Sequence, residues 1–242
     1  MIQIEKVTKS FNERKVLDNV SLSIEKGECV FILGKSGVGK SVLLKAIVGL
    51  IEIDCGSITV GGLKVDPTSQ ETLSQVRKGC GLVFQFSALL DSVNVFENIC
   101  FGLRARGLKF SEENLSRLVK DKLAITGLSE AVLERYPTEL SFGAQKRVSI
   151  ARALAVEPNY LLFDEPTTGM DPIAIQGINR LIIELSTQLK VTTVVVSHDI
   201  KSALEVGKRI VLLEHGRVVF DDKPENFKNS TVPLAREFQL GL

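Results

Sequence analysis

The chain has 242 residues, of which 44% are hydrophobic and 24% are charged, and its formal net charge is +1. This composition is typical of a soluble globular protein, and the small net charge excludes a global electrostatic attraction to nucleic acid or anionic lipid. The first residues lack the apolar segment of a signal peptide, and no run of about 18 apolar residues would let the chain span a membrane.

The cysteine and histidine content favours neither a disulfide framework nor a histidine-based metal site. The four cysteines are Cys29, Cys55, Cys80 and Cys100, and none forms a C-x-x-C pair. Three of them lie among apolar residues, which is typical of reduced thiols in a cytosolic protein. The chain has only two histidines, too few for most histidine-based metal sites.

Near the N-terminus, residues 2–7 and 20–24 have the alternating pattern of edge strands. Residues 57–62 form another strand pattern that ends in a turn. Together these segments predict a small antiparallel sheet beside the core of the protein.

Residues 34–41 match the phosphate-loop pattern G-x-x-x-x-G-K-[ST]. The apolar run 29–33 before them predicts a buried strand, and residues 42–48 predict a helix. In this setting the glycines let backbone N–H groups face phosphate oxygens, and the helix start adds its positive dipole end. We expect Lys40 to reach the β- and γ-phosphates and Ser41 to ligate Mg²⁺. The alternative is an ordinary glycine-rich turn, against which the flanking strand and helix argue.

A short apolar strand at 81–85 ends in Gln85, whose amide is a candidate ligand of a metal or of water. The alternative is a polar strand-end residue without a function. From about 94 to 155 the pattern is mostly helical, with apolar residues at intervals of three and four.

Ser141 is expected to cap the helix predicted over 148–156. Because the free N–H groups of a helix start favour an anion, Ser141 and Gly143 are candidate phosphate contacts.

The apolar run 160–163 predicts a buried parallel strand that ends in Asp164 and Glu165. Beside a phosphate loop, Asp164 is expected to hold Mg²⁺, and Glu165 to orient and deprotonate the attacking water. A further run, 191–196, leads to His198 at the same sheet edge, where we expect a γ-phosphate contact. The alternatives are solvated acids and a surface histidine.

Residues 210–213 and 218–220 predict a hairpin, with His215 as an ordinary turn residue. The polar stretch 223–242 predicts a short tail. The predicted organisation is therefore an α/β core with a helical insertion.

In this order, the motifs resemble the ATPase subunit of ATP-binding cassette (ABC) transporters. The matching motifs are the phosphate loop at 34–41, Gln85 of the Q-loop, the signature at 140–145, Walker B at 163–166 and the switch histidine His198. The resemblance implies an α/β fold: a P-loop NTPase (RecA-like) core, an antiparallel β subdomain and an inserted α-helical subdomain. It implies one ABC ATPase domain over 1–242, with the insertion at about 86–158 and the tail at about 223–242.

The resemblance also implies an ATPase that uses ATP and Mg²⁺, and it gives each site residue a role. Catalysis is assigned to Glu165, His198 and Gln85, and the metal to Ser41, Gln85 and Asp164. The residues assigned to the nucleotide are Phe11, Gly34, Lys35, Ser36, Gly37, Val38, Gly39, Lys40, Ser41, Ser141, Gly143 and Asp171. Phe11 is the expected adenine-stacking aromatic, with a core aromatic beside a turn as its alternative, and Asp171 belongs to the D-loop.

In the family, two such subunits sandwich two ATP molecules head to tail. The resemblance therefore implies a homodimer in which Ser141 and Gly143 of one subunit face the ATP bound by the other. It implies that the Gln85 region passes motion to an integral membrane permease, at the cytoplasmic face of the inner membrane. It implies no nucleic-acid partner.

The signature departs from the family's L-S-G-G-Q at two positions, Phe142 and Ala144. Ser141 and Gly143, the expected phosphate contacts, are present. Phe142 puts a bulky side chain where glycine gives backbone freedom. We expect ATPase activity to be retained.

Residues 84–92 and 95–98 resemble the ATPases of MCE-domain (Mla-type) lipid transporters, as does the ending 236–241. Importers of sugars and of many amino acids usually carry a proline near Asp91, where this chain has Asp91-Ser92. The resemblance implies lipid as cargo and an MCE-domain lipid-binding protein as partner. In that subfamily the tail docks on the neighbouring ATPase, and a frayed terminus is the alternative.

Three other functions are weighed against lipid transport. One is the ATPase of an amino-acid or other small-solute importer. A soluble ABC ATPase acting on DNA or ribosomes is disfavoured because the chain has one cassette, no sustained heptads and no basic tract. A non-hydrolysing cassette is disfavoured because four expected site residues are intact, namely Lys40, Asp164, Glu165 and His198.

Overall fold

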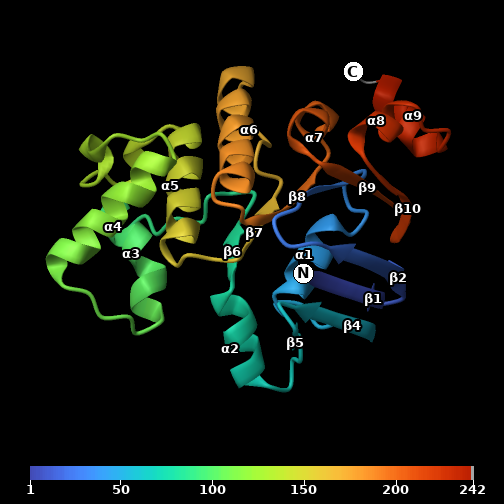
Figure 1. Cartoon of the computed structure of the whole chain (residues 1–242), viewed down its shortest axis with the longest axis horizontal. Coiled ribbons are helices and arrows are strands. Elements are labelled where there is room, and N and C mark those ends of the chain that lie inside the picture. The colour runs from blue at the N-terminus through green and yellow to red at the C-terminus, as the bar shows by residue number, and fades with distance from the viewer. Residues whose placement is uncertain (241–242) are drawn as a thin grey trace.

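The computed structural model describes residues 1–240, which form two sheets and an inserted group of helices (Figure 1). The larger sheet has six strands in the order β10-β9-β3-β8-β7-β6, and all neighbours are parallel except β10 and β9. Its strands are β3 (Cys29–Leu33), β6 (Cys80–Val83), β7 (Tyr160–Asp164), β8 (Thr192–Ser197), β9 (Arg209–Glu214) and β10 (Arg217–Asp222). The predicted parallel strands and the predicted hairpin are confirmed.

The smaller sheet is antiparallel, as predicted, in the order β2-β1-β4-β5. Its strands are β1 (Ile2–Phe11), β2 (Arg14–Ile24), β4 (Cys55–Val60) and β5 (Leu63–Lys64). The prediction that 2–7 is an edge strand is wrong, because β1 pairs with β2 on one side and β4 on the other. Register shifts near Lys6, which has a φ of 49°, let β1 continue to Phe11.

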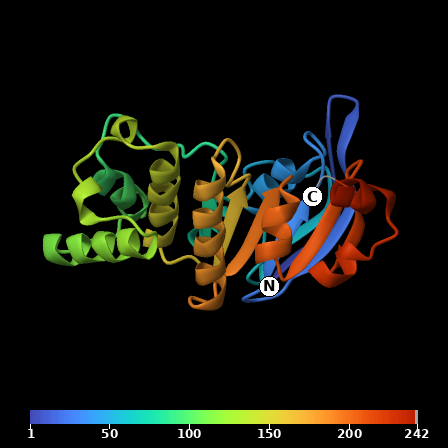
Figure 2. The same ribbon diagram turned by 90° about the horizontal axis from the view of Figure 1, so that it is seen from above.

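The strands of the larger sheet are buried on both faces. Val30 and Ile32 of β3 pack in a core shared with the smaller sheet and with α1 (Lys40–Ile47). Phe31 and Leu33 point the other way, into a core shared with α6 (Pro172–Thr187) and α7 (Ile200–Val206). From above, α6 and α7 lie on one face of the sheet and α1 on the other (Figure 2). Helix α2 (Gln70–Lys78) precedes β6.

The insertion between β6 and β7 has its own core. It consists of α3 (Val95–Ala105), α4 (Glu112–Ile125), two short 3-10 helices (Glu130–Val132 and Pro137–Glu139) and α5 (Phe142–Ala155). Apolar residues of all three α-helices meet, among them Ile99, Val119 and Val148. The side chain of Ser141 caps α5 by accepting a hydrogen bond from Ala144 N at 3.3 Å, as predicted.

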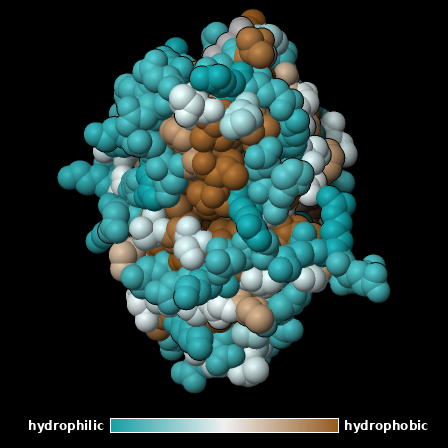
Figure 3. Space-filling view, turned by 90° about the vertical axis from the view of Figure 1, so that its right-hand side faces the viewer, coloured by the Kyte–Doolittle hydropathy of each residue, from teal (hydrophilic) through white to brown (hydrophobic). Residues whose placement is uncertain are grey.

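The C-terminal segment folds back on the core as α8 (Pro224–Lys228) and α9 (Pro233–Leu240). Phe227 and Leu234 are buried in the core. Residues 236–240 are helical in α9, and Phe238 packs against the same core, which contradicts a frayed terminus over 236–240. Gly241, the last residue of the predicted tail motif, lies outside the described residues. The face that carries these helices is mostly hydrophilic, with apolar side chains gathered in one hollow (Figure 3). Over residues 1–240, no helix has the length and apolar character needed to cross a bilayer.

Candidate functional site

The phosphate loop joins β3 to α1, as predicted, and two of its glycines fix the chain path. Gly37 and Gly39 have φ angles of 75° and 110°, which favour glycine. A Cβ atom at Gly34 would lie 2.5 Å from the carbonyl oxygen of Leu213. Within the described residues, no side chain caps the start of α1, so its first N–H groups are available to an anion.

Lys40 is buried at the first position of α1, with only 5% of its surface exposed. Its Nζ donates to the carbonyl oxygens of Gly34 and Lys35 at 2.8 and 3.1 Å. Glu165 Oε1 lies 3.3 Å from the same ammonium. The loop thus holds a desolvated cation at the position where a phosphate would need one.

Ser41 and Asp164 form the oxygen pair expected of a metal site. Asp164 ends β7, and its Oδ1 accepts a hydrogen bond of 2.6 Å from Ser41 Oγ. Mg²⁺ prefers few protein oxygens together with phosphate and water oxygens. The donor set of one hydroxyl and one carboxylate, next to a phosphate loop, therefore fits Mg²⁺ bound with a nucleotide.

Glu165 follows Asp164 in the left-handed region, with a φ of 48°. This conformation is strained for a residue with a Cβ atom, and such strain is often found at functional sites. The carboxylate Oε2 lies 2.8 Å from His198 Nδ1 and accepts a hydrogen bond of 3.2 Å from Thr168 Oγ1. In the tautomer that has a proton on Nδ1, His198 donates this hydrogen bond and the Glu165 oxygen accepts it.

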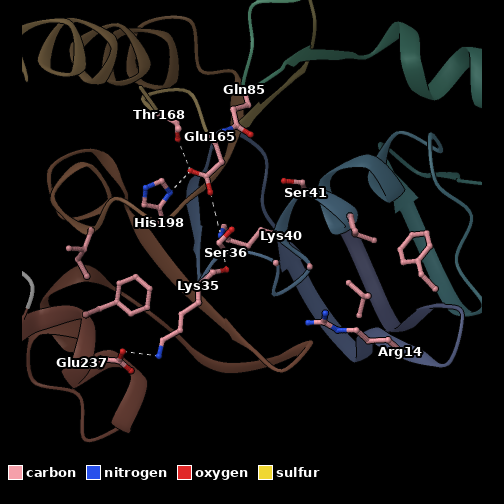
Figure 4. A pocket seen from close by; sticks show the side chains of 17 residues that line it. Arg14, Lys35, Ser36, Lys40, Ser41, Gln85, Glu165, Thr168, His198 and Glu237 are labelled. Carbon is pink, nitrogen blue, oxygen red and sulfur yellow. Dashed lines mark hydrogen bonds and ion pairs between the residues drawn. The ribbon is translucent and has the colours of Figure 1, made fainter. Parts of the chain in front are cut away.

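These side chains surround one pocket of about 970 Å³ (Figure 4). Phe11 lines it and is 45% exposed, which contradicts the alternative of a core aromatic. Gln85 projects from the far side toward Glu165 (Figure 4). The other predicted residues in the lining are Lys35, Ser36, Gly37, Gly39, Lys40, Ser41, Glu165 and His198.

Several predicted residues lie outside this lining. Gly34, Val38 and Asp164 belong to the surrounding loop and strand end. Ser141 and Gly143 lie at the start of α5 in the insertion. Asp171 caps α6, because its Oδ1 accepts hydrogen bonds from Ile173 N and Ala174 N at 3.0 Å. In this structure its carboxylate therefore binds the start of its own helix.

The sequence reasoning missed seven lining residues, which are Arg14, Val16, Val42, Thr168, Ile200, Glu237 and Phe238. Arg14 and Val16 follow Phe11 across the hairpin turn, and their pairing in β2 is not visible as a motif. Thr168 is placed by the turn after Glu165. Glu237 and Phe238 come from α9, and Glu237 Oε1 lies 2.7 Å from Lys35 Nζ. Only the resemblance of the tail could have drawn attention to them.

Comparison with protein-family models places residues 17–168, more than half of the chain, in the family described as ABC transporter. The glutamine transport ATP-binding protein GlnQ of Escherichia coli K12 is 42% identical over 241 residues, which cover 98% of each chain. The probable ribonucleotide transport ATP-binding protein mkl of Mycobacterium tuberculosis H37Rv is 35% identical, over 99% of this chain and 66% of the relative.

Solved structures agree in fold. The dimeric cassette MJ0796, described as a bacterial ABC transporter cassette, has a TM-score of 0.85 and 34% identity, over 93% of this chain and 99% of that one. A post-hydrolysis state of the same cassette, with ADP and Pi bound, has a TM-score of 0.84 and 33% identity, over the same shares.

Proposed function

The chain belongs to the ABC transporter family of ATPases, and on this premise we propose that it energises lipid transport by separate membrane subunits. It is an ATP-hydrolysing subunit that uses Mg²⁺, and cassettes of this family act as dimers with membrane permeases. The residue roles, the lipid cargo, the MCE-domain partner and the cytoplasmic face of the inner membrane are parts of the proposal.

One observation carries the catalytic part: a buried lysine, a serine–aspartate pair and a glutamate–histidine pair meet around one pocket. We expect the Lys40 ammonium to leave the carbonyl oxygens of its own loop and bind the β- and γ-phosphates when ATP enters. Glu165 then loses Lys40 as its counter-ion but keeps His198 and Thr168. The freed carboxylate is placed to accept a proton from the attacking water.

Ser41 and Asp164 would hold Mg²⁺, which supplies positive charge to the phosphate oxygens. Gln85 reaches the same pocket from the insertion and is proposed as a further ligand of the metal or the water. Ser141 and Gly143 are proposed to contact the nucleotide of a second copy, which agrees with their position outside this pocket.

A separate groove supports docking of a membrane partner. It has a volume of about 360 Å³ and lies between β6, the loop after Gln85 and α3. Leu90 and Phe101 in its lining are 38% and 51% exposed, and Phe86 nearby is 72% exposed. Large apolar side chains gathered at a surface mark a binding site for another protein. Phe101→Asp should therefore abolish co-purification of the permease, whereas Phe110→Asp, at an exposed site outside the groove, should not.

The lipid assignment rests on the resemblance of 84–92, 95–98 and the tail to MCE-type transport ATPases. The ordered α9 supports it, because a folded C-terminal helix at the nucleotide pocket suits a tail with a function. The competing assignment is an amino-acid importer. The 42% identity with a glutamine transport protein over 98% of both chains favours it.

Purification of the tagged protein from its own membranes in mild detergent separates these assignments. Co-purifying proteins and lipids are identified by mass spectrometry. A permease with an MCE-domain protein and bound lipid would support lipid transport. A permease with a solute-binding protein would transfer the assignment to a small-solute importer. ATPase activity without any membrane partner would favour a soluble ATPase.

A further inference from the structure

Lys146 is a buried cation in the insertion that no part of the proposed mechanism uses. It lies on α5, and none of its surface is exposed. Its Nζ donates hydrogen bonds to the carbonyl oxygens of Phe84 and Gln85 at 2.8 and 2.5 Å. None of the ion pairs within residues 1–240 involves Lys146, and burial lowers its pKa to about 8, although the negative charge of Asp164 acts in the opposite direction. A buried ammonium that forms no direct ion pair is costly, so these carbonyl contacts must compensate it.

Phe142 completes the surroundings of this ammonium. The centre of its ring lies 5.8 Å from Lys146 Nζ, within range of a cation–π interaction. The two residues are four apart on α5, so their side chains lie on the same side of the helix. The aromatic side chain that replaces glycine in the signature therefore covers the cation that binds Gln85.

The contact continues along the same helix. Arg152, which is also on α5, donates to the carbonyl oxygens of Ser87 and Ala88 at 3.0 and 2.7 Å. Ala88 has a φ of 48°, a conformation that needs support from its surroundings. Two cations of α5 therefore hold the main chain of residues 84–88, the segment that carries Gln85 into the nucleotide pocket.

We propose that Lys146 is a positioning residue which, with Phe142, links the start of α5 to Gln85. Ser141 at the start of α5 and Gln85 in the pocket then move as one unit. Lys146 does not line the pocket, so it acts only through Gln85. The proposal rests on the proposed role of Gln85 in hydrolysis.

The test is a double-mutant cycle on the full-length ATPase, purified with its membrane subunits. Lys146→Met removes the ammonium but keeps an unbranched side chain, and Gln85→Ala removes the amide. Lys146→Met should lower kcat about fivefold or more and leave ATP affinity unchanged, because it disturbs the position of Gln85 and not the binding of the nucleotide. Residues in contact couple energetically, so the effect should depend on whether Gln85 is present. In the Gln85→Ala background, Lys146→Met should lower kcat no further. Equal effects in both backgrounds, or no effect of Lys146→Met, would overturn the proposal.

Control variants separate positioning from loss of structure. Lys120→Met makes the same change at a partly exposed lysine of α4, whose ammonium pairs with Glu130, and should leave kcat unchanged. Phe142→Leu should lower kcat in the same direction as Lys146→Met, whereas Phe142→Tyr, which keeps the aromatic face, should restore it toward wild type. Equal kcat values for these two Phe142 variants would contradict the role of the ring. A Gln85→Ala variant with wild-type kcat would show that neither Gln85 nor Lys146 takes part in hydrolysis. The assignment of the chain as an ATPase would not be affected by that result.

Discussion

Replacing Asn98 by alanine is expected to destabilise the segment that follows Gln85, because one buried amide holds it in place. Asn98 lies in α3 and none of its surface is exposed. Its Oδ1 accepts from Leu90 N at 2.8 Å. Its Nδ2 lies 3.0, 3.1 and 3.0 Å from the carbonyl oxygens of Leu90, Val93 and Asn94.

The expected cost follows from these contacts. The Nδ2 group has two hydrogens, so the three carbonyl oxygens share two donors, and Oδ1 adds one accepted bond. Three hydrogen bonds at about 1 kcal/mol each, with buried main-chain groups left unpaired, give a loss of about 2–4 kcal/mol in the free energy of unfolding. Asn98→Asp keeps the size of the side chain but faces the carbonyl oxygens with a second acceptor. Its cost should be at least as large, which excludes cavity formation as the main cause.

The measurement is equilibrium urea denaturation, with hydrogen exchange of peptides from 88–98 as a local readout. Asn114→Ala is the matched control, because Asn114 is exposed on α4 and accepts one hydrogen bond from Arg117. It should change the unfolding free energy by less than about 0.5 kcal/mol. A loss below about 1 kcal/mol in Asn98→Ala, with unchanged exchange in 88–98, would refute the reasoning.

Three further predictions concern the nucleotide pocket and the thiols. Lys40→Ala should weaken ATP binding in a fluorescence titration, because it removes the only buried ammonium in the described pocket lining; unchanged affinity would contradict this role. Glu165→Gln should bind ATP with normal affinity, but its hydrolysis rate should fall to about one hundredth of the wild-type rate or lower, since the amide cannot accept a proton. Wild-type turnover would exclude Glu165 as the base. Burial raises the pKa of three of the four thiols to about 11 or 12, so iodoacetamide at pH 8 should modify the exposed Cys55 alone, as read by mass spectrometry; labelling of a second thiol in the native protein would contradict the packing.

Much of the site could be predicted because its chemistry depends on residues that are close in sequence. The phosphate loop and the acidic strand end are local patterns, and the parallel sheet brings them to one edge. The strained turn at Glu165 and its contact with Thr168 depend on backbone conformation, which sequence patterns do not specify. A lysine in a helix is ordinarily expected at the surface. The burial of Lys146 depends on where an insertion packs on the core, so it could not be predicted.

The fold, like the site, could be predicted where it depends on local sequence patterns. Continuous apolar runs identified the strands that are buried on both faces. The extension of β1 to Phe11 was not predicted, because it follows register shifts that carry no residue signature. The tail appeared polar as a whole, yet Phe227 and Leu234 bury one side of it against the core.

The position of the insertion in the chain has an evolutionary consequence. It leaves the core after β6 and returns at β7, and these strands are neighbours at one edge of the sheet. Exchanging it by recombination would disturb no strand pairing and would leave the phosphate loop and Glu165 in place. Because α5 holds the main chain from Phe84 to Ala88, a functional chimera would need both parts from one parent. A single crossover between residue 88 and α5 would take these two parts from different parents. Permease preference should therefore be inherited as one block from Phe84 to Ala155.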